Sequence, residues 1–278
     1  MTFDRRLALA AALFAAGLAT SAHAAIVAGK DGAPPTPNTP NTPKFTETLP
    51  GVDLSGVWII DQRVGGGTRE AIDKRVLKDA NGQAIPTQPW AQKLYDEHVA
   101  GERIGHTFVT PSTQCLPHGM PEMVTGAGYP LEIFQRNGEV AFIHELLRTW
   151  RIVYLDRGHL NDPDPTYYGD GVGHWEGDTL VIDTVGLNGK NVLDMLGMPT
   201  TEKMHVVERV RKIGPDKLDW DITIDDPGAY TKPWKEHVTF TRQPKNVELL
   251  EYICQAGNRN LVVDGKVTVD GKGGVPGN

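Results

Sequence analysis

The residues best suited to acid–base chemistry lie between His205 and Arg209, in a segment that alternates as a β-strand does. Side chains alternate between the two faces of a strand, so His205 and Arg209 share one face and Glu208 lies on the other. If the face of His205 points into a cavity, the arginine favours the neutral imidazole, which can act as a base. Alternatively, His205 and Arg209 face solvent, opposite Val206 and Val210. His205 and Glu208 are candidate catalytic residues, and Arg209 is a candidate ligand-binding residue.

A second strand pattern carries two more arginines. Trp150, Ile152 and Tyr154 alternate with Arg151, and Arg148 precedes them. If the aromatic face lines a cavity, Arg148 points inward with it and would bind an anionic or carbonyl group. The alternative is a buried arginine–carboxylate pair that closes a barrel. Arg148, Arg151 and Tyr154 are therefore candidate ligand-binding residues.

The segment 156–168 is predicted to be a long irregular loop, because Pro163 and Pro165 are unfavourable in a strand. Loops of this length are often functional, so His159 is a third catalytic candidate. Tyr167 and Tyr168 are candidates for the rim of a ligand site, and Trp234 is a further candidate ligand-binding residue. The alternative is a surface Ω-loop.

Other acidic motifs are better explained as turns. The run from Trp175 to Leu180 predicts a hairpin with Gly177-Asp178 at its turn, and Asp225-Asp226-Pro227-Gly228 predicts another turn, although Ca²⁺ binding there stays open. The sequence contains no H-E-x-x-H, no P-loop and no G-x-S-x-G. We expect no cofactor and no built-in metal site.

The two cysteines, Cys115 and Cys254, lie far apart in the chain. An even number of cysteines in an exported chain favours a disulfide between them. Two buried free thiols are the alternative.

These residues must be positioned mainly by short strands. Alternation with a period of two predicts strands at 150–154, 179–184, 204–213, 218–224, 236–241 and 247–254. Turn signals separate several of them, including Asn137-Gly138 and Gly214-Pro215-Asp216. A helix is predicted at 87–99, with Thr87 as its N-terminal cap.

The stretch Gly56-Val57-Trp58 opens the strand-rich region, and a Gly-x-Trp on the first strand resembles lipocalin-like barrels, in which the Trp plugs the closed end. A meander of short strands also closes well as a barrel. The predicted fold is therefore all-β: a lipocalin-like, calycin-type antiparallel barrel with one or two short helices.

Charge and composition limit the function classes. The chain has 278 residues, a net charge of -7 and no basic cluster, which argues against nucleic-acid binding. Arg5-Arg6, an apolar run and Ala22-His23-Ala24 form a signal peptide at 1–24, so we expect a secreted or periplasmic protein without a membrane span. A proline-rich tether (25–50), a barrel domain (51–265) and a flexible tail (266–278) follow.

From about residue 53 to 258 the chain is similar to a widespread group of secreted bacterial proteins without a characterised activity. The similarity is carried by the motifs Gly173-His174-Trp175-Glu176-Gly177-Asp178-Thr179-Leu180-Val181-Ile182-Asp183-Thr184, His205-Val206-Val207-Glu208-Arg209 and Ile224-Asp225-Asp226-Pro227-Gly228-Ala229-Tyr230-Thr231-Lys232-Pro233-Trp234. It implies a shared fold and no particular reaction. The chain has Pro199-Thr200-Thr201-Glu202 where the group tends to have Pro-His-Ser-Glu.

The expected function is action on a small, partly apolar molecule of aromatic, terpenoid or sugar-derived type. As an enzyme, the protein would use cofactor-free acid–base chemistry of the lyase, hydratase or isomerase type. The alternative is a non-catalytic carrier or scavenger of the same ligand.

Overall fold

The structure is a computed structural model that describes residues 51–64, 78–104, 106, 108–126, 128–194, 196–254, 261–263 and 266–268. The expected signal peptide (1–24) and tether (25–50) lie outside the described residues. The cysteine, strand and loop predictions all fall inside them.

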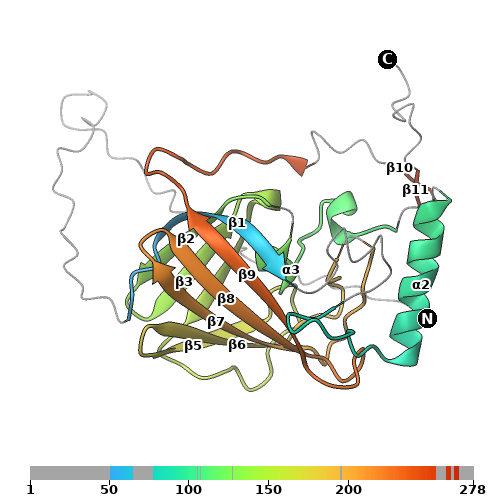
Figure 1. Cartoon of the computed structure of the whole chain (residues 1–278), viewed down its shortest axis with the longest axis horizontal. Coiled ribbons are helices and arrows are strands. Elements are labelled where there is room, and N and C mark those ends of the chain that lie inside the picture. Colours follow the sequence, from blue (N-terminus) through green and yellow to red (C-terminus); the bar gives the residue numbers. More distant parts are fainter. Residues whose placement is uncertain are drawn as a thin grey trace, which may run out of the picture. The chain divides into compact units, whose positions relative to one another are not determined.

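Nine strands form a closed barrel in which each strand pairs with its neighbour in the chain and β1 also pairs with β9 (Figure 1). The strands are β1 (Gly56–Val64), β2 (Leu131–Arg136), β3 (Glu139–His144), β4 (Thr149–Tyr154), β5 (Asp170–Glu176), β6 (Thr179–Val185), β7 (His205–Gly214), β8 (Lys217–Asp225) and β9 (Trp234–Arg242). The prediction of an all-β barrel formed by a meander of neighbouring strands is confirmed.

One strand pair departs from the antiparallel pattern. β4 and β5 run parallel and share only two residue pairs, Val153 with Gly171 and Tyr154 with Val172. The connection 155–169 must therefore double back before β5 begins beside the last residues of β4. This β4–β5 seam has the shortest register in the barrel, since β1 and β2 share three pairs.

The helices all lie in connections. They are α2 (Pro89–Arg103), α3 (Glu122–Thr125) and the 3₁₀ turns η1 (Pro111–Gln114) and η2 (Leu146–Arg148). α2 begins two residues after the predicted start, with Gln88 rather than Thr87 as its N-cap. Thr87 instead pairs with Tyr230 in an isolated bridge. A separate two-stranded sheet joins β10 (Leu261–Val263) to β11 (Lys266–Thr268), and β11 falls in the segment expected to be a tail.

The barrel interior is filled by large apolar side chains, as the alternation in each strand predicts. On β8, Leu218, Trp220, Ile222 and Ile224 are fully buried and point inward, while Asp221 between them is exposed. Phe142, Trp220 and Phe240 follow one another with ring centroids 5.6 Å apart. The barrel interior around these rings is thus a packed core.

Trp58 closes the end of the barrel at which β1 starts. It is fully buried, its indole N–H donates to the carbonyl of Leu54, and the guanidinium of Arg242 lies 4.6 Å from its ring centroid. A Cβ on Gly56 would lie 3.0 Å from Arg242 Nη1, and Gly56 has φ +131°, so glycine suits this position. The Gly-x-Trp of the sequence therefore forms the expected plug.

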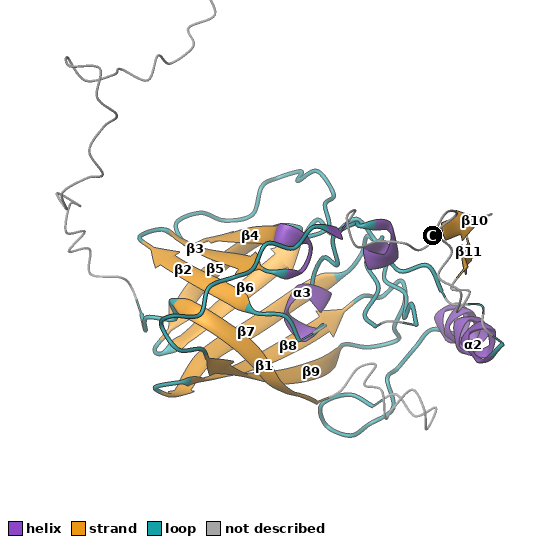
Figure 2. Cartoon of the chain, turned by 90° about the horizontal axis from the view of Figure 1, so that it is seen from above, coloured by secondary structure: helices purple, strands orange, loops and turns teal. Residues whose placement is uncertain are grey.

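The opposite, open end is covered by residues 118–126, which include α3 (Figure 2). Met120 and Met123 of this plug segment are buried in the same core as the barrel strands. The Asn191 side chain donates to the carbonyls of Met120 and Tyr167 and thereby joins three loops. The loops at this end can therefore position side chains above the packed core.

Residues 243–254 form a strap along the outside of the barrel, so the predicted strand at 247–254 is wrong. The strap starts near the closed end, where the Gln243 amide donates to Val57, and reaches the open end, where the Leu250 amide donates to Glu145. Because β1 and β9 already close the barrel, no strand edge of the barrel is free to pair with the strap.

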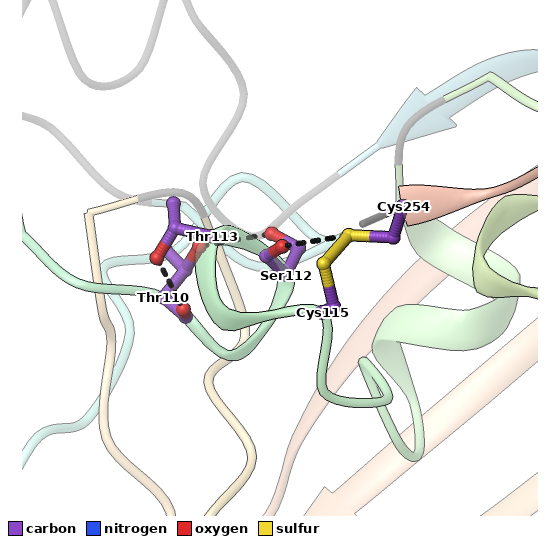
Figure 3. The surroundings of a disulfide bond; sticks show 5 residues. All are labelled: Thr110, Ser112, Thr113, Cys115 and Cys254. Carbon is purple, nitrogen blue, oxygen red and sulfur yellow. Dashed lines mark hydrogen bonds between the residues drawn. A yellow bond between two sulfur atoms is a disulfide. The ribbon is translucent and has the colours of Figure 1, made fainter. Parts of the chain in front are cut away.

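The predicted disulfide between Cys115 and Cys254 is present and fastens the end of the strap (Figure 3). Cys115 follows η1, whose turn is tightened by the Thr113 hydroxyl donating to the Thr110 carbonyl. The Cys254 sulfur lies 3.8 Å from the Ser112 carbonyl oxygen. The bond joins the strap to the loops at the open end.

Candidate functional site

The inward orientation considered for His205 and Arg209 is wrong. On β7 it is Val206, Glu208 and Val210 that are fully buried. The Arg209 guanidinium lies outside and pairs with Glu176 at 2.7 Å. The alternation was predicted correctly, but the interior takes the face with two valines and leaves the His205 face on the outer wall.

His205 and His159 nevertheless come together on that outer wall. The Nε2 atoms of both rings lie 2.9 Å from Asp183 Oδ1, and His159 Nδ1 lies 3.0 Å from Asp170 Oδ2. Arg157 also pairs with Asp170. We call Arg157, His159, Asp170, Asp183 and His205 the outer-wall cluster.

The cluster favours a charged His159. Both ring nitrogens face carboxylates, so the ring satisfies both only when each nitrogen carries a proton. Burial alone would lower the pKa of His159, but the hydrogen bonds to Asp183 and Asp170 outweigh it and raise the pKa above its usual value. Arg157 holds the pKa of Asp170 at about 2. Through these contacts the cluster holds the connection 155–169 against β5 and β6, beside the short β4–β5 seam.

We expect His159→Gln to lower the melting temperature more at pH 6 than at pH 8.5. Protonated His159 stabilises the fold fully below its unfolded pKa of about 6.5, and this contribution is lost as the pH rises through the raised pKa of the folded state. Thermal melts at both pH values measure the difference. His174→Gln, on an exposed side chain of β5, is the matched control. A His159→Gln deficit that is equal at both pH values would contradict this role.

Arg151, not Arg148, is the inward arginine of β4. Trp150 is exposed on the outer face, and Arg151 and Val153 are buried, so the face expected to line a cavity is the outer one. The Arg151 guanidinium donates to Glu208 at 2.6 Å and to Thr184 at 2.7 Å. Arg151 and Glu208 thus form the buried arginine–carboxylate pair that was the alternative for this strand.

The remaining predicted residues are dispersed. Arg148 is half exposed and pairs with Glu251 of the strap, and Tyr154 lies outside under Arg157, whose guanidinium is 4.2 Å from its ring centroid. Tyr168 packs against the core, and Trp234 is buried within it. Tyr167 contributes its carbonyl, which accepts from Met120 and Asn191. These residues do not form one site.

A pocket of about 260 Å³ lies at the open end, among loops that the sequence analysis did not group. Its polar wall includes His118 and Glu122 of the plug segment and Asp194 of the β6–β7 connection. Leu146, Val192 and the rings of Tyr129 and Tyr252 add apolar surface, and η1 closes one side. Tyr252 belongs to the strap, so the disulfide holds one wall of the pocket in place.

His118 and Glu122 are four residues apart and face each other at the start of α3. His118 Nδ1 lies 3.9 Å from Glu122 Oε1, and the Glu122 side chain is only 6% exposed. The other ring nitrogen, Nε2, is buried without a hydrogen-bond partner among the described residues. With its proton on Nδ1 toward Glu122, the imidazole offers Nε2 as an acceptor.

Asp194 forms the opposite part of the polar wall. One oxygen accepts from the backbone amides of Leu196 and Met198, and the other accepts from the Tyr95 hydroxyl of α2 at 2.8 Å. Burial raises the pKa of Asp194, and the charge of Glu122 adds to this effect. Asp194 thus shapes its loop and also brings a second carboxyl group to the pocket.

The nearby His144 ends β3 inside the barrel. Burial lowers its pKa to about 4, and repulsion from His118 contributes. His144 is therefore uncharged at neutral pH and adds no positive charge to this end of the barrel.

Sequence reasoning missed these residues because they come from separate connections. The short spacing of His118 and Glu122 was the available signal, although a turn and not a helix brings them together, since α3 begins only at Glu122. Asp183 was placed on a strand without a role, although alternation puts it opposite Ile182 and Thr184. In the described part of the chain, no three His, Cys, Asp or Glu side chains are grouped so that they could hold a metal ion. None of the described helices is long and apolar enough to cross a membrane.

No known family model and no curated protein matches the chain. Among solved structures, it is similar to the REP1-NXSQ fatty acid transporter, with 10% identity, a TM-score of 0.33 and coverage of 70% of this chain and 98% of that chain. It is also similar to a mutant of the fluorescent protein UnaG, with 13% identity, a TM-score of 0.31 and coverage of 69% of this chain and 97% of that chain. At these values neither likeness identifies a ligand, and the pocket has to be interpreted from its own geometry.

Proposed function

We propose that this is an exported barrel protein that binds a small, partly apolar molecule in the open-end pocket and acts on it by cofactor-free acid–base chemistry. The observation that carries the proposal is the pair of His118 and Glu122 in the pocket lining: Nδ1 of His118 faces the Glu122 carboxylate, and Nε2 is buried without a hydrogen-bond partner among the described residues. A disulfide-bonded fold supports an oxidising compartment outside the cytoplasm.

In this proposal His118 is the general base. Glu122 orients the ring through Nδ1, and Nε2 accepts a proton from the bound molecule. The distance of 3.9 Å between Nδ1 and Oε1 exceeds a hydrogen bond, and such contacts often tighten when a ligand binds. Hydroxyl groups of η1 and the two tyrosines would stabilise charge that develops on a leaving or carbonyl oxygen.

The alternative function is a carrier of the same ligand. The apolar part of the pocket favours it, because Leu146, Val192, Tyr129 and Tyr252 provide affinity without chemistry. A carrier would yield a bound molecule on mild denaturation and no product on incubation.

We expect His118→Gln to reduce turnover by about 10²–10⁴, the usual contribution of general acid–base catalysis. The measurement is product formation by the oxidised, full-length protein in a mixture of small metabolites. Glu122→Gln should also reduce turnover, since the imidazole loses its orienting partner.

Exposed residues provide the controls. His174→Gln and Glu97→Gln should leave turnover unchanged, because both side chains lie on the surface outside the pocket. Undiminished turnover in folded His118→Gln would contradict the catalytic role. Co-purified ligand without any product would favour the carrier.

A further inference from the structure

The charge of the open-end pocket restricts which molecules it can take. Its described lining includes two buried carboxyl groups, Glu122 and Asp194, and no lysine or arginine. The guanidinium of Arg151, which contacts the sulfur of Met120, is paired with Glu208. The guanidinium of Arg148 is paired with Glu251. His118 is the only side chain of the described lining that can carry a positive charge.

The polar atoms of the lining that lack strong partners are hydrogen-bond acceptors. Glu122 accepts only a long contact of 3.4 Å from the Thr125 hydroxyl among the described residues, which leaves most of its acceptor capacity unused. His118 Nε2 is a buried acceptor when the ring proton lies on Nδ1, toward Glu122. A buried carboxylate without strong partners is costly, and a ligand cation would offset this cost.

The aromatic side of the pocket suits the same kind of ligand. Tyr129 and Tyr252 meet edge to face, with centroids 5.6 Å apart and planes at 90°. Aromatic rings beside carboxylates attract ammonium groups through both the ring quadrupole and the negative charge. The volume of about 260 Å³ is near the lower limit for small-molecule sites and suits one ring with a short side chain.

We propose that the open-end pocket binds a small organic cation, namely a single-ring amine whose ammonium group lies against the Glu122 carboxylate. This inference rests on the proposed function, because it names the ligand class of the same pocket. The ammonium N–H groups donate to the Glu122 carboxylate, and the ring lies against the two tyrosines.

The test compares three probes of equal size by calorimetry on the oxidised full chain: benzylamine, benzyl alcohol and benzoate. Benzylamine should bind at least about tenfold more tightly than benzyl alcohol, since one charge-assisted hydrogen bond is worth this much. Benzoate should not bind measurably. Glu122→Gln should remove the preference for the amine, and Glu97→Gln should keep it.

A second variant tests the inference independently, in case Glu122→Gln does not fold. Thr113→Lys adds a cation to the pocket wall without touching the carboxyl groups, and it should abolish amine binding. Benzyl alcohol or benzoate binding as tightly as the amine would overturn the inference and leave the proposed function standing. Absence of binding by all three probes would also overturn it, while the proposed function fails separately if no metabolite is bound or turned over.

Discussion

Replacing Arg151 with methionine should lower the free energy of unfolding by about 3–5 kcal/mol, because it leaves Glu208 buried without its partner. Both side chains are almost fully buried, at 2% and 0% exposure, and are joined at 2.6 Å. Denaturant unfolding at pH 7 measures the loss. The pair holds together β4 and β7, on opposite sides of the short β4–β5 seam.

The pH dependence of that variant identifies the cause. An unpaired buried carboxyl group takes up a proton more readily than the same group in the unfolded chain, so the folded variant gains stability as the pH falls. The deficit should therefore shrink between pH 7 and about pH 4, where carboxyls of the unfolded chain become protonated.

The double variant Arg151→Met/Glu208→Gln is the control for this prediction. It removes both charges, so it should be more stable at pH 7 than Arg151→Met alone. A single variant that costs less than about 1 kcal/mol, or a double variant that is no better, would show that the pair contributes little.

The double replacement Cys115→Ser/Cys254→Ser should have an effect of similar size. The two residues are 139 positions apart, and releasing a loop of this length costs about 4–5 kcal/mol in the chain-entropy model. For a domain of this size the melting temperature should fall by about 10–20 °C. Calorimetry of the oxidised wild type and the double variant makes the comparison, and the reduced wild type should melt with the variant.

A melting temperature within a few degrees of wild type would contradict this prediction, because it would show that the strap is held without the disulfide. The strap otherwise depends on exposed contacts, such as Arg148 with Glu251. The strap also brings an unfavourable contact, between Glu248 and Glu132. Burial is the larger cause and like-charge repulsion from Glu248 the smaller cause of the raised pKa of the partly buried Glu132. These surface contacts are too weak to fix the strap alone.

The barrel could be predicted from the sequence because it rests on local signals. Alternation located most strands, Asn137-Gly138 and Gly177-Asp178 located hairpin turns, and Gly56 with Trp58 indicated the plugged end. The disulfide followed from the number of cysteines and the expected compartment. Each of these signals needs only neighbouring residues or composition.

The candidate site could not be predicted in the same way. The alternation of side chains along the strand placed His205 and Arg209 on one face. It could not decide which face is inside, since both faces of β7 carry valine. That choice depends on Arg151, which lies 57 residues from Glu208 and satisfies its charge. His118 and Asp194 belong to different connections, and only the closed barrel brings them to one pocket.

The pairing of β1 with β9 has a consequence for how the chain assembles. Trp58 of β1 lies opposite Arg242 of β9. The sheet therefore stays open, with two exposed edges, until β9 has been synthesised and has paired with β1. Contacts between such distant residues slow folding, because the entropy of closing the loop is lost before the pairing stabilises it. If the chain is exported unfolded, it crosses a membrane before the barrel can close, and the barrel forms only on the far side.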